Sequence, residues 1–154
     1  MKKLIFVSMV LAAILMITGT AMATAQWNRN DTRSLKNGGH LVAAVDVSGD
    51  SNSVTISAGS DADIKKLFEG LLLWNIKLTP GTGDEAPSGT VDVTIACGGW
   101  SLTWSALSNT TTSIKSIYEA DSPPSTPPMI TGDITITVSN LGSGNTAVLE
   151  PIFW

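Results

Sequence analysis

Side chains that could do chemistry are few in this sequence and lie far apart. His40 is the only histidine and Cys97 is the only cysteine. A Ser-His-Asp triad needs an imidazole base in a matched constellation, and a zinc site needs more histidine or cysteine ligands than one of each. Asp84 and Glu85 are adjacent on a Gly/Pro-rich loop, where nothing fixes the carboxylate separation that glycoside hydrolysis requires. We therefore predict no catalytic residues, no cofactor and no internal disulfide.

Four oxygen-bearing side chains alternate between residues 46 and 52. Asp46, Ser48, Asp50 and Asn52 have a spacing typical of calcium-binding loops. No glutamate follows at the closing position, and Ser, Gly, Asp and Asn are also the usual residues of turns. The sequence favours an ordinary hairpin turn here, and a weak calcium site remains the alternative.

Trp100 and Trp104 fall on the same face of an alternating segment, with Leu102 between them. Exposed tryptophans bind the apolar faces of sugars, so this pair is a candidate glycan-binding platform. The leucine between them favours a core face or a subunit interface instead, because large aromatic side chains dominate burial in small domains. We favour core or interface and keep the sugar platform as the alternative.

The segment 147–154 carries apolar side chains on both of its faces. Ile152, Phe153 and Trp154 are therefore predicted to contribute to an interface between copies of the chain, because an open apolar face usually marks an association surface. The alternative is a central strand whose two faces are both covered within one subunit. A terminal aromatic also resembles the last strand of outer-membrane barrels, but Glu150 lies where that pattern has an apolar residue.

The first 25 residues have the three parts of a secretory signal peptide. A positively charged start is followed by an apolar run over residues 4–17 and by small residues over 18–25. The apolar run is short for a membrane span, so an uncleaved anchor helix is the less favoured alternative. We predict cleavage between Ala23 and Gln26 and export to the periplasm or the extracellular space.

Composition limits the classes of partner. Removal of the predicted signal peptide leaves seven basic and thirteen acidic side chains, a formal net charge of −6. Such a chain lacks the basic face that nucleic acids and anionic membrane surfaces attract. Charged residues make up only 14% of the sequence, whereas Ser, Thr and Gly are abundant, which is typical of β-rich exported proteins. Without a disulfide, a domain of this size depends on core packing or on association with further copies.

Short alternating segments indicate an all-β domain over residues 40–154. They predict an antiparallel β-sandwich or jelly roll of about seven to eight strands. The strand candidates are residues 40–47, 53–57, 71–78, 91–95, 100–105, 134–139 and 147–154.

Three other segments have different patterns. Residues 61–69 follow an N-cap signature with apolar positions at helical spacing, which predicts one short helix. Residues 26–39 are polar and are predicted to form an N-terminal arm. The prolines within 110–128 predict a stiff extended loop and exclude a central strand there.

From Leu71 to Trp154 the order of motifs resembles a group of small virion-associated proteins of tailed bacteriophages. The turn Pro80-Gly81 precedes the strand Val91-Asp92-Val93-Thr94-Ile95, and a Pro-rich loop leads to the closing segment Gly132 to Asn140. The group shares a Pro-Gly turn, a D-V-T strand and a closing G-x-L-T-L-T-V-S-G-N strand pair. The resemblance implies a structural role with no enzyme activity and no cofactor. Trp100 and Trp104 depart from it, because the group has a more polar segment there.

These observations predict a non-enzymatic structural protein, a phage or prophage virion component that acts by self-association. Its partners would be further copies or other virion proteins, with no nucleic acid and, after signal cleavage, no membrane. The first alternative is a secreted adhesin-like or carbohydrate-binding module with a glycan partner. The second is a small outer-membrane β-barrel.

Overall fold

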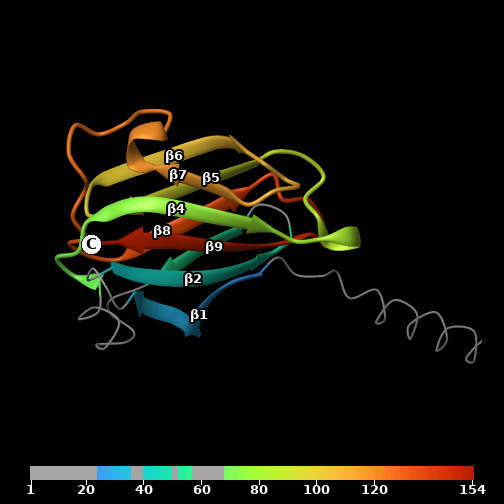
Figure 1. Ribbon diagram of the computed structural model, residues 1–154, viewed down its shortest axis with the longest axis horizontal. Helices are drawn as coiled ribbons and strands as arrows, with labels where there is room; N and C mark the ends of the chain where they lie inside the picture. The colour runs from blue at the N-terminus through green and yellow to red at the C-terminus, as the bar shows by residue number, and fades with distance from the viewer. Residues whose placement is uncertain (1–23, 36–39, 50–51, 57–67) are drawn as a thin grey trace, which may run out of the picture.

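The computed structural model describes residues 24–35, 40–49, 52–56 and 68–154, and these form nine β-strands (Figure 1). Two short 3₁₀ helices also occur, η1 (Gly83–Glu85) and η2 (Ile117–Glu119). None of the helical segments in these ranges is long and apolar enough to cross a membrane. The strands are β1 (Thr24–Leu35), β2 (His40–Ser48), β3 (Asn52–Ile56), β4 (Leu73–Pro80), β5 (Val91–Cys97), β6 (Trp100–Leu107), β7 (Ser113–Ser116), β8 (Ile134–Ser139) and β9 (Thr146–Phe153).

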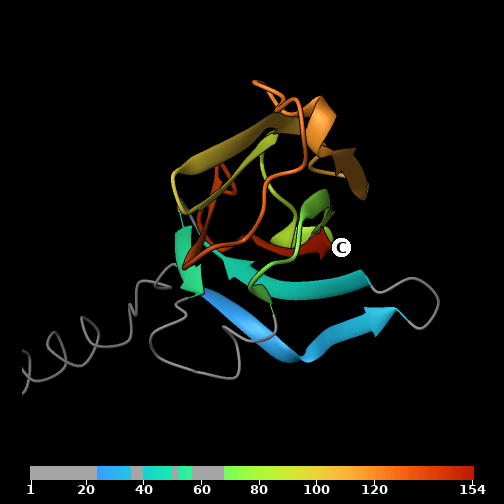
Figure 2. The same ribbon diagram turned by 90° about the vertical axis from the view of Figure 1, so that its left-hand side faces the viewer.

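The strands form two antiparallel sheets. One has the order β1-β2-β9-β4-β7 and the other has the order β3-β8-β5-β6. Figure 2 shows the same strands turned by 90° about the vertical axis of Figure 1, with β1 and β2 crossing the lower part of the view. β2 pairs with β9, β3 with β8, β4 with β7 and β5 with β6. This is the pairing of one long hairpin rolled upon itself, the jelly roll, so the predicted fold class is confirmed.

The core lies between the two sheets and follows the period of two in the sequence. Buried and partly buried residues alternate along the whole of β5 and β8. The inward face of the other sheet contributes Ile76 and Leu78 from β4 and Leu149 from β9, all fully buried. The outward positions of β8 are occupied by Thr and Ser, and those of β5 by Asp92, Thr94 and Ala96, because antiparallel sheets can keep one face in water.

The polar segment 26–39, expected to be an arm, contains most of β1. This strand pairs with β2 along its length, with an irregularity between Asn28 and Arg33. A strand at the edge of a sheet is held by backbone hydrogen bonds, and polar side chains are common there because they discourage further pairing. A search for alternating apolar residues therefore does not predict such an edge strand.

The segment 48–52 does not close a hairpin. It leads from β2 in one sheet to β3 in the other, and these two strands pair with different neighbours. The predicted helix at 61–69 falls mostly outside the described residues. Within them, Phe68 is buried and packs edge-on against Phe153, with 5.2 Å between ring centroids.

β9 lies in the middle of its sheet, between β2 and β4 (Figure 1). Phe153 is 1% exposed, so it belongs to the core and not to an association surface. On the opposite face Glu150 is buried and forms an ion pair with Lys77 of β4. Apolar residues occur on both faces of this strand because a central strand is covered more fully than an edge strand. The fold therefore matches the alternative prediction for this segment, a central strand whose two faces are both covered within one subunit.

Asp92 is hydrogen-bonded to two residues whose backbone conformation is rare for residues other than glycine. Ala106 has a φ of 57° and Asn140 a φ of 63°. One carboxylate oxygen of Asp92 accepts a hydrogen bond from the Ala106 N–H at 2.8 Å, and the other accepts one from the Asn140 side-chain amide at 2.8 Å. The left-handed conformations at the irregular end of β6 and at the end of β8 are thus tied to the same side chain.

Replacing Asp92 with alanine is expected to lower the free energy of unfolding by about 1.5–3 kcal/mol, because hydrogen bonds to a charged group are lost while both strained residues remain. Urea unfolding monitored by tryptophan fluorescence measures this change. Ser101→Ala, on the exposed part of β6, is the control and is expected to change stability by less than about 0.5 kcal/mol. Equal effects of the two substitutions would contradict the role given to Asp92.

Candidate functional site

The residues that the sequence singled out for chemistry do not come together in the described part of the chain. Cys97 is buried, and its thiol donates a long hydrogen bond of 3.5 Å to the Gly132 carbonyl. Asp84 and Glu85 are exposed on η1. The side chain of His40 lies outside the described residues. No group of three His, Cys, Asp or Glu side chains within the described ranges has the geometry to hold a metal ion.

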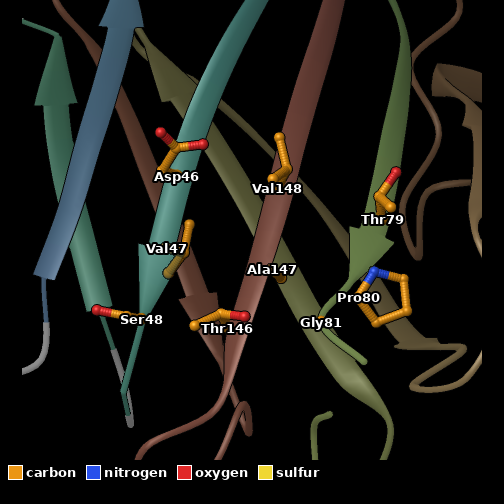
Figure 3. A pocket seen from close by; sticks show the side chains of 9 residues that line it. All are labelled: Asp46, Val47, Ser48, Thr79, Pro80, Gly81, Thr146, Ala147 and Val148. Carbon is orange, nitrogen blue, oxygen red and sulfur yellow. The ribbon is translucent and has the colours of Figure 1, made fainter. Parts of the chain in front are cut away.

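The candidate calcium ligands are only partly described. Asp46 and Ser48 occupy alternate positions of β2, whereas Asp50 and the side chain of Asn52 lie outside the described residues. Asp46 and Ser48 line an open pocket of about 320 Å³ together with Thr79 and Thr146 (Figure 3). The Thr146 hydroxyl donates a hydrogen bond of 3.1 Å to Glu85 at this end of the sheet.

The close packing of this pocket depends on Gly81. A Cβ atom at that position would lie 2.6 Å from the Glu85 carbonyl oxygen, so only glycine fits. The pocket is open and its lining is more apolar than polar, and its described residues do not assemble a catalytic or metal-binding set.

Trp100 and Trp104 do not form an exposed platform. Trp104 is 1% exposed, and its indole N–H donates a hydrogen bond of 2.9 Å to the Ser116 carbonyl. Trp100 is partly buried against the core, and its indole N–H donates a bond of 2.9 Å to the Met129 carbonyl. The two residues share a face of β6, as the alternation predicts, but that face is turned towards the core.

Exposed aromatic side chains gather elsewhere, at the end of the sandwich where β9 finishes and β4 begins. Trp74 is 37% exposed, Tyr118 is 51% exposed and Trp154 is 52% exposed. The ring centroids of Trp74 and Trp154 are 5.9 Å apart, and those of Trp74 and Tyr118 are 6.4 Å apart. The three rings therefore form one continuous row with Trp74 at its centre.

Backbone pairing accounts for this row. Leu72 and Trp154 exchange two backbone hydrogen bonds, of 2.7 Å and 2.9 Å, just beyond the ends of β4 and β9. The register between these strands shifts between Leu73 and Asn75, and this irregularity leaves Trp74 exposed while Leu73 is buried. Trp74 and Trp154 are thereby brought to one surface by strands whose other residues form the core.

An apolar residue extends the row on its other side. Met129, which is 51% exposed, forms an isolated bridge with Leu72. Side chains at directly paired positions share one face of a sheet, so Met129, Leu72 and Trp154 lie on the same side. We define the aromatic patch by the residues that these contacts connect, which are Leu72, Trp74, Tyr118, Met129 and Trp154.

A short capped turn presents Tyr118 to this patch. The Ser116 N–H donates a hydrogen bond of 2.9 Å to the Glu119 carboxylate, which closes a capping box around η2. Lys115 donates a second bond of 3.0 Å to the same carboxylate. The backbone bond from Ser116 and then the side-chain bond from Lys115 hold the pKa of Glu119 below its ordinary value of 4.5.

Replacing Glu119 with glutamine is expected to remove an acid-dependent loosening of η2. A carboxylate whose pKa is lowered by folding stabilises the folded state above the unfolded pKa near 4.5, and this contribution disappears as the pH falls through the lower folded value. The near-ultraviolet circular dichroism of the aromatic patch should therefore change below pH 4.5 in the wild type. The same titration of Glu119→Gln should be flatter in that range, and identical curves would contradict this role.

The surroundings of the aromatic patch combine paired charges with open polar groups. The Lys115–Glu119 and Lys77–Glu150 ion pairs lie on the neighbouring parts of β7, η2, β4 and β9, and each has a net charge of zero. The Asn75 amide, the Trp74 indole N–H and the Tyr118 hydroxyl form no hydrogen bond within the described ranges. The patch thus offers apolar ring faces together with polar groups that can bind a partner.

The sequence reasoning did not find this patch. Trp154 is the only one of its five residues named as a candidate from the sequence, together with Ile152, which is partly buried. Trp74 lies in the apolar run 71–78, which is typical of a buried strand, and the irregularity that exposes it is a property of the pairing with β9. Tyr118 is placed by η2, inside a segment expected to be a loop.

No protein-family model matches the chain, and no curated protein matches it. Among solved structures, the chain is similar to one from Desmodium yellow mottle tymovirus, with 8% sequence identity and a TM-score of 0.32. That similarity covers 74% of this chain and 85% of the other. A likeness of this size does not transfer a function.

Proposed function

We propose that this protein is a non-enzymatic structural component that acts by self-association through the aromatic patch. The observation that carries the proposal is the continuous row of Trp154, Trp74 and Tyr118, three exposed aromatic side chains that are connected through Trp74 at one end of the domain. Soluble monomers rarely expose contiguous apolar surface, and larger patches mark sites of interaction.

The residue types in the patch suit a protein interface. Tryptophan, tyrosine and methionine are enriched at the centres of interfaces, and tryptophan and tyrosine are frequent energetic hot spots. Charge supports a second copy as the partner. The full chain has a net charge of −4, whereas the charged pairs bordering the patch cancel, so two copies approach there with little repulsion.

The setting that we propose is the virion of a tailed bacteriophage. Its support is the resemblance of Leu71–Trp154 to small virion-associated proteins, together with a fold that occurs in viral capsid and lectin domains. A fold alone does not assign a function, so the setting needs a test of its own. Mass spectrometry of purified phage particles should detect peptides from residues 40–154, and their absence from particles made by cells that express the protein would contradict this setting.

Light scattering over a dilution series tests self-association itself. The wild-type chain is expected to have a mass above that of one subunit at micromolar concentration and to approach it on dilution. A mass of one subunit throughout the series would remove the basis of the proposal.

Glycan binding is a second candidate function for the same patch. It is favoured by the open Asn75 amide, Trp74 indole N–H and Tyr118 hydroxyl, because a sugar stacks on a ring face while its hydroxyls bind neighbouring polar groups. Calorimetric titration with neutral oligosaccharides tests this candidate. Saturable binding that Trp74→Ala abolishes in a protein of one-subunit mass would favour the glycan over the second copy.

A further inference from the structure

β6 is one of the two edge strands of the four-stranded sheet in the described part of the chain, and β3 is the other. In an antiparallel pair, alternate residues direct their backbone N–H and C=O groups away from the partner strand. The hydroxyls of Thr94 and Thr103 lie 2.9 Å apart, as expected for a pair that does not exchange backbone bonds. Thr103 and its alternates Ser101 and Ser105 therefore present their backbone groups to the open edge.

Asp121 occupies part of this edge. Its N–H donates a hydrogen bond of 2.8 Å to the Thr103 carbonyl, and its carboxylate accepts one of 3.2 Å from the Ser105 N–H. The Ser105 hydroxyl donates a further bond of 2.6 Å to the same carboxylate. In a parallel ladder, one residue bonds the carbonyl of position i and the N–H of position i+2. Asp121 forms the same two bonds as a residue of a parallel strand would, to the Thr103 carbonyl and the Ser105 N–H. Its side-chain carboxylate takes the place of its backbone carbonyl as the acceptor.

We propose that the edge of β6 is a strand-docking surface for a second copy of the chain and that Asp121 keeps it closed. Exposed strand edges pair readily with other strands, and proteins block them with charges, prolines or irregularities. β6 contains neither a charged residue nor a proline. The carboxylate of Asp121 is therefore the charge bound to this edge, and the left-handed Ala106 interrupts the strand beyond it.

The composition of β6 favours a second copy as the partner. Two β6 edges related by a two-fold axis would pair as antiparallel strands, and the uncharged Ser101, Thr103 and Ser105 would meet without like-charge contacts. This inference goes beyond the proposed function, because the edge belongs to the other sheet and does not require the aromatic patch. It describes how association by strand pairing is suppressed in the native subunit.

Asp121→Ala, made in the Trp154→Ser background, tests the proposal independently of the patch. The substitution leaves only the residue-121 N–H bond to Thr103, so hydrogen exchange at the Ser105 amide should become at least tenfold faster at dilutions where the protein has the mass of one subunit. The mass measured by light scattering should double or grow further with concentration. Asp121→Asn retains an acceptor oxygen. It is expected to keep the Ser105 amide protected from exchange and to have the same mass as the background protein.

A reversing substitution completes the design. Ser101→Lys added to Asp121→Ala places a like charge on both edges and should restore the mass of the background protein while Ser105 stays exposed. Continued protection of Ser105 in Asp121→Ala at one-subunit mass, or fast exchange with no gain in mass as the concentration rises, would overturn the proposal. If Asp121→Ala does not fold, Asp121→Ser takes its place, because serine is too short to reach the Ser105 N–H, and the same two measurements decide.

Discussion

Replacing Trp104 with alanine is expected to lower the free energy of unfolding by about 3–5 kcal/mol, the largest effect of any single substitution considered for this fold. The side chain is 1% exposed and lies between the two sheets, so its removal leaves a cavity that the surrounding β-strands cannot fill. It also removes the hydrogen bond to the Ser116 carbonyl at the end of β7. The midpoint of urea unfolding should fall sharply, because this loss is a large fraction of the stability of an ordinary domain.

Trp100→Phe is the matched control for this prediction. Trp100 lies on the same strand face, but it is only partly buried and its indole bonds the Met129 carbonyl near the surface. Its replacement is expected to cost about 1 kcal/mol, mainly the lost hydrogen bond. Equal losses for the two variants would show that Trp104 does not have the central position in the core that the structure assigns to it.

Replacing Trp74 and Trp154 together with serine is expected to dissociate the assembled protein while leaving the subunit folded. Both side chains are substantially exposed in the subunit, so the cost to folding is small. As interface hot spots they would each contribute about 2 kcal/mol or more, so the dissociation constant should rise by roughly three orders of magnitude for the pair. Sedimentation velocity measures this shift.

Ile114→Ser is the matched control. Ile114 is 62% exposed on β7, and it is apolar like the two tryptophans but lies outside the aromatic patch. Its replacement is expected to leave the dissociation constant within a few-fold of the wild type. Retained assembly in the double tryptophan variant, with an unchanged melting temperature, would contradict the patch as the interface.

Local patterns in the sequence predicted much of the fold. The alternation in β5 and β8 matches their buried faces residue by residue, because each strand has one face in the core and one in water. β1 and the four-residue β7 escaped prediction because edge strands depend on backbone pairing more than on apolar side chains. The sequence therefore predicts which face of a strand is buried, but it does not predict which segments pair at the edge of a sheet.

The candidate site was less accessible to such reasoning, because it depends on contacts between distant segments. The sequence identified the face of β6 that carries Trp100 and Trp104, but only the packing shows that this face belongs to the core. Trp74 is exposed by a shift in register against β9, and Tyr118 reaches it from η2. The central position of β9 likewise follows from pairing with β2 and β4, strands far from it in sequence.

Hydroxyl-radical footprinting at low and high protein concentration tests the central claim most directly, since it reports where copies of the chain touch. The account predicts that Trp74, Tyr118 and Trp154 lose reactivity together as concentration rises, while Ile114 keeps the reactivity of an exposed side chain. Assembly without protection of these three aromatic residues, or protection confined to another surface, would contradict self-association through the aromatic patch.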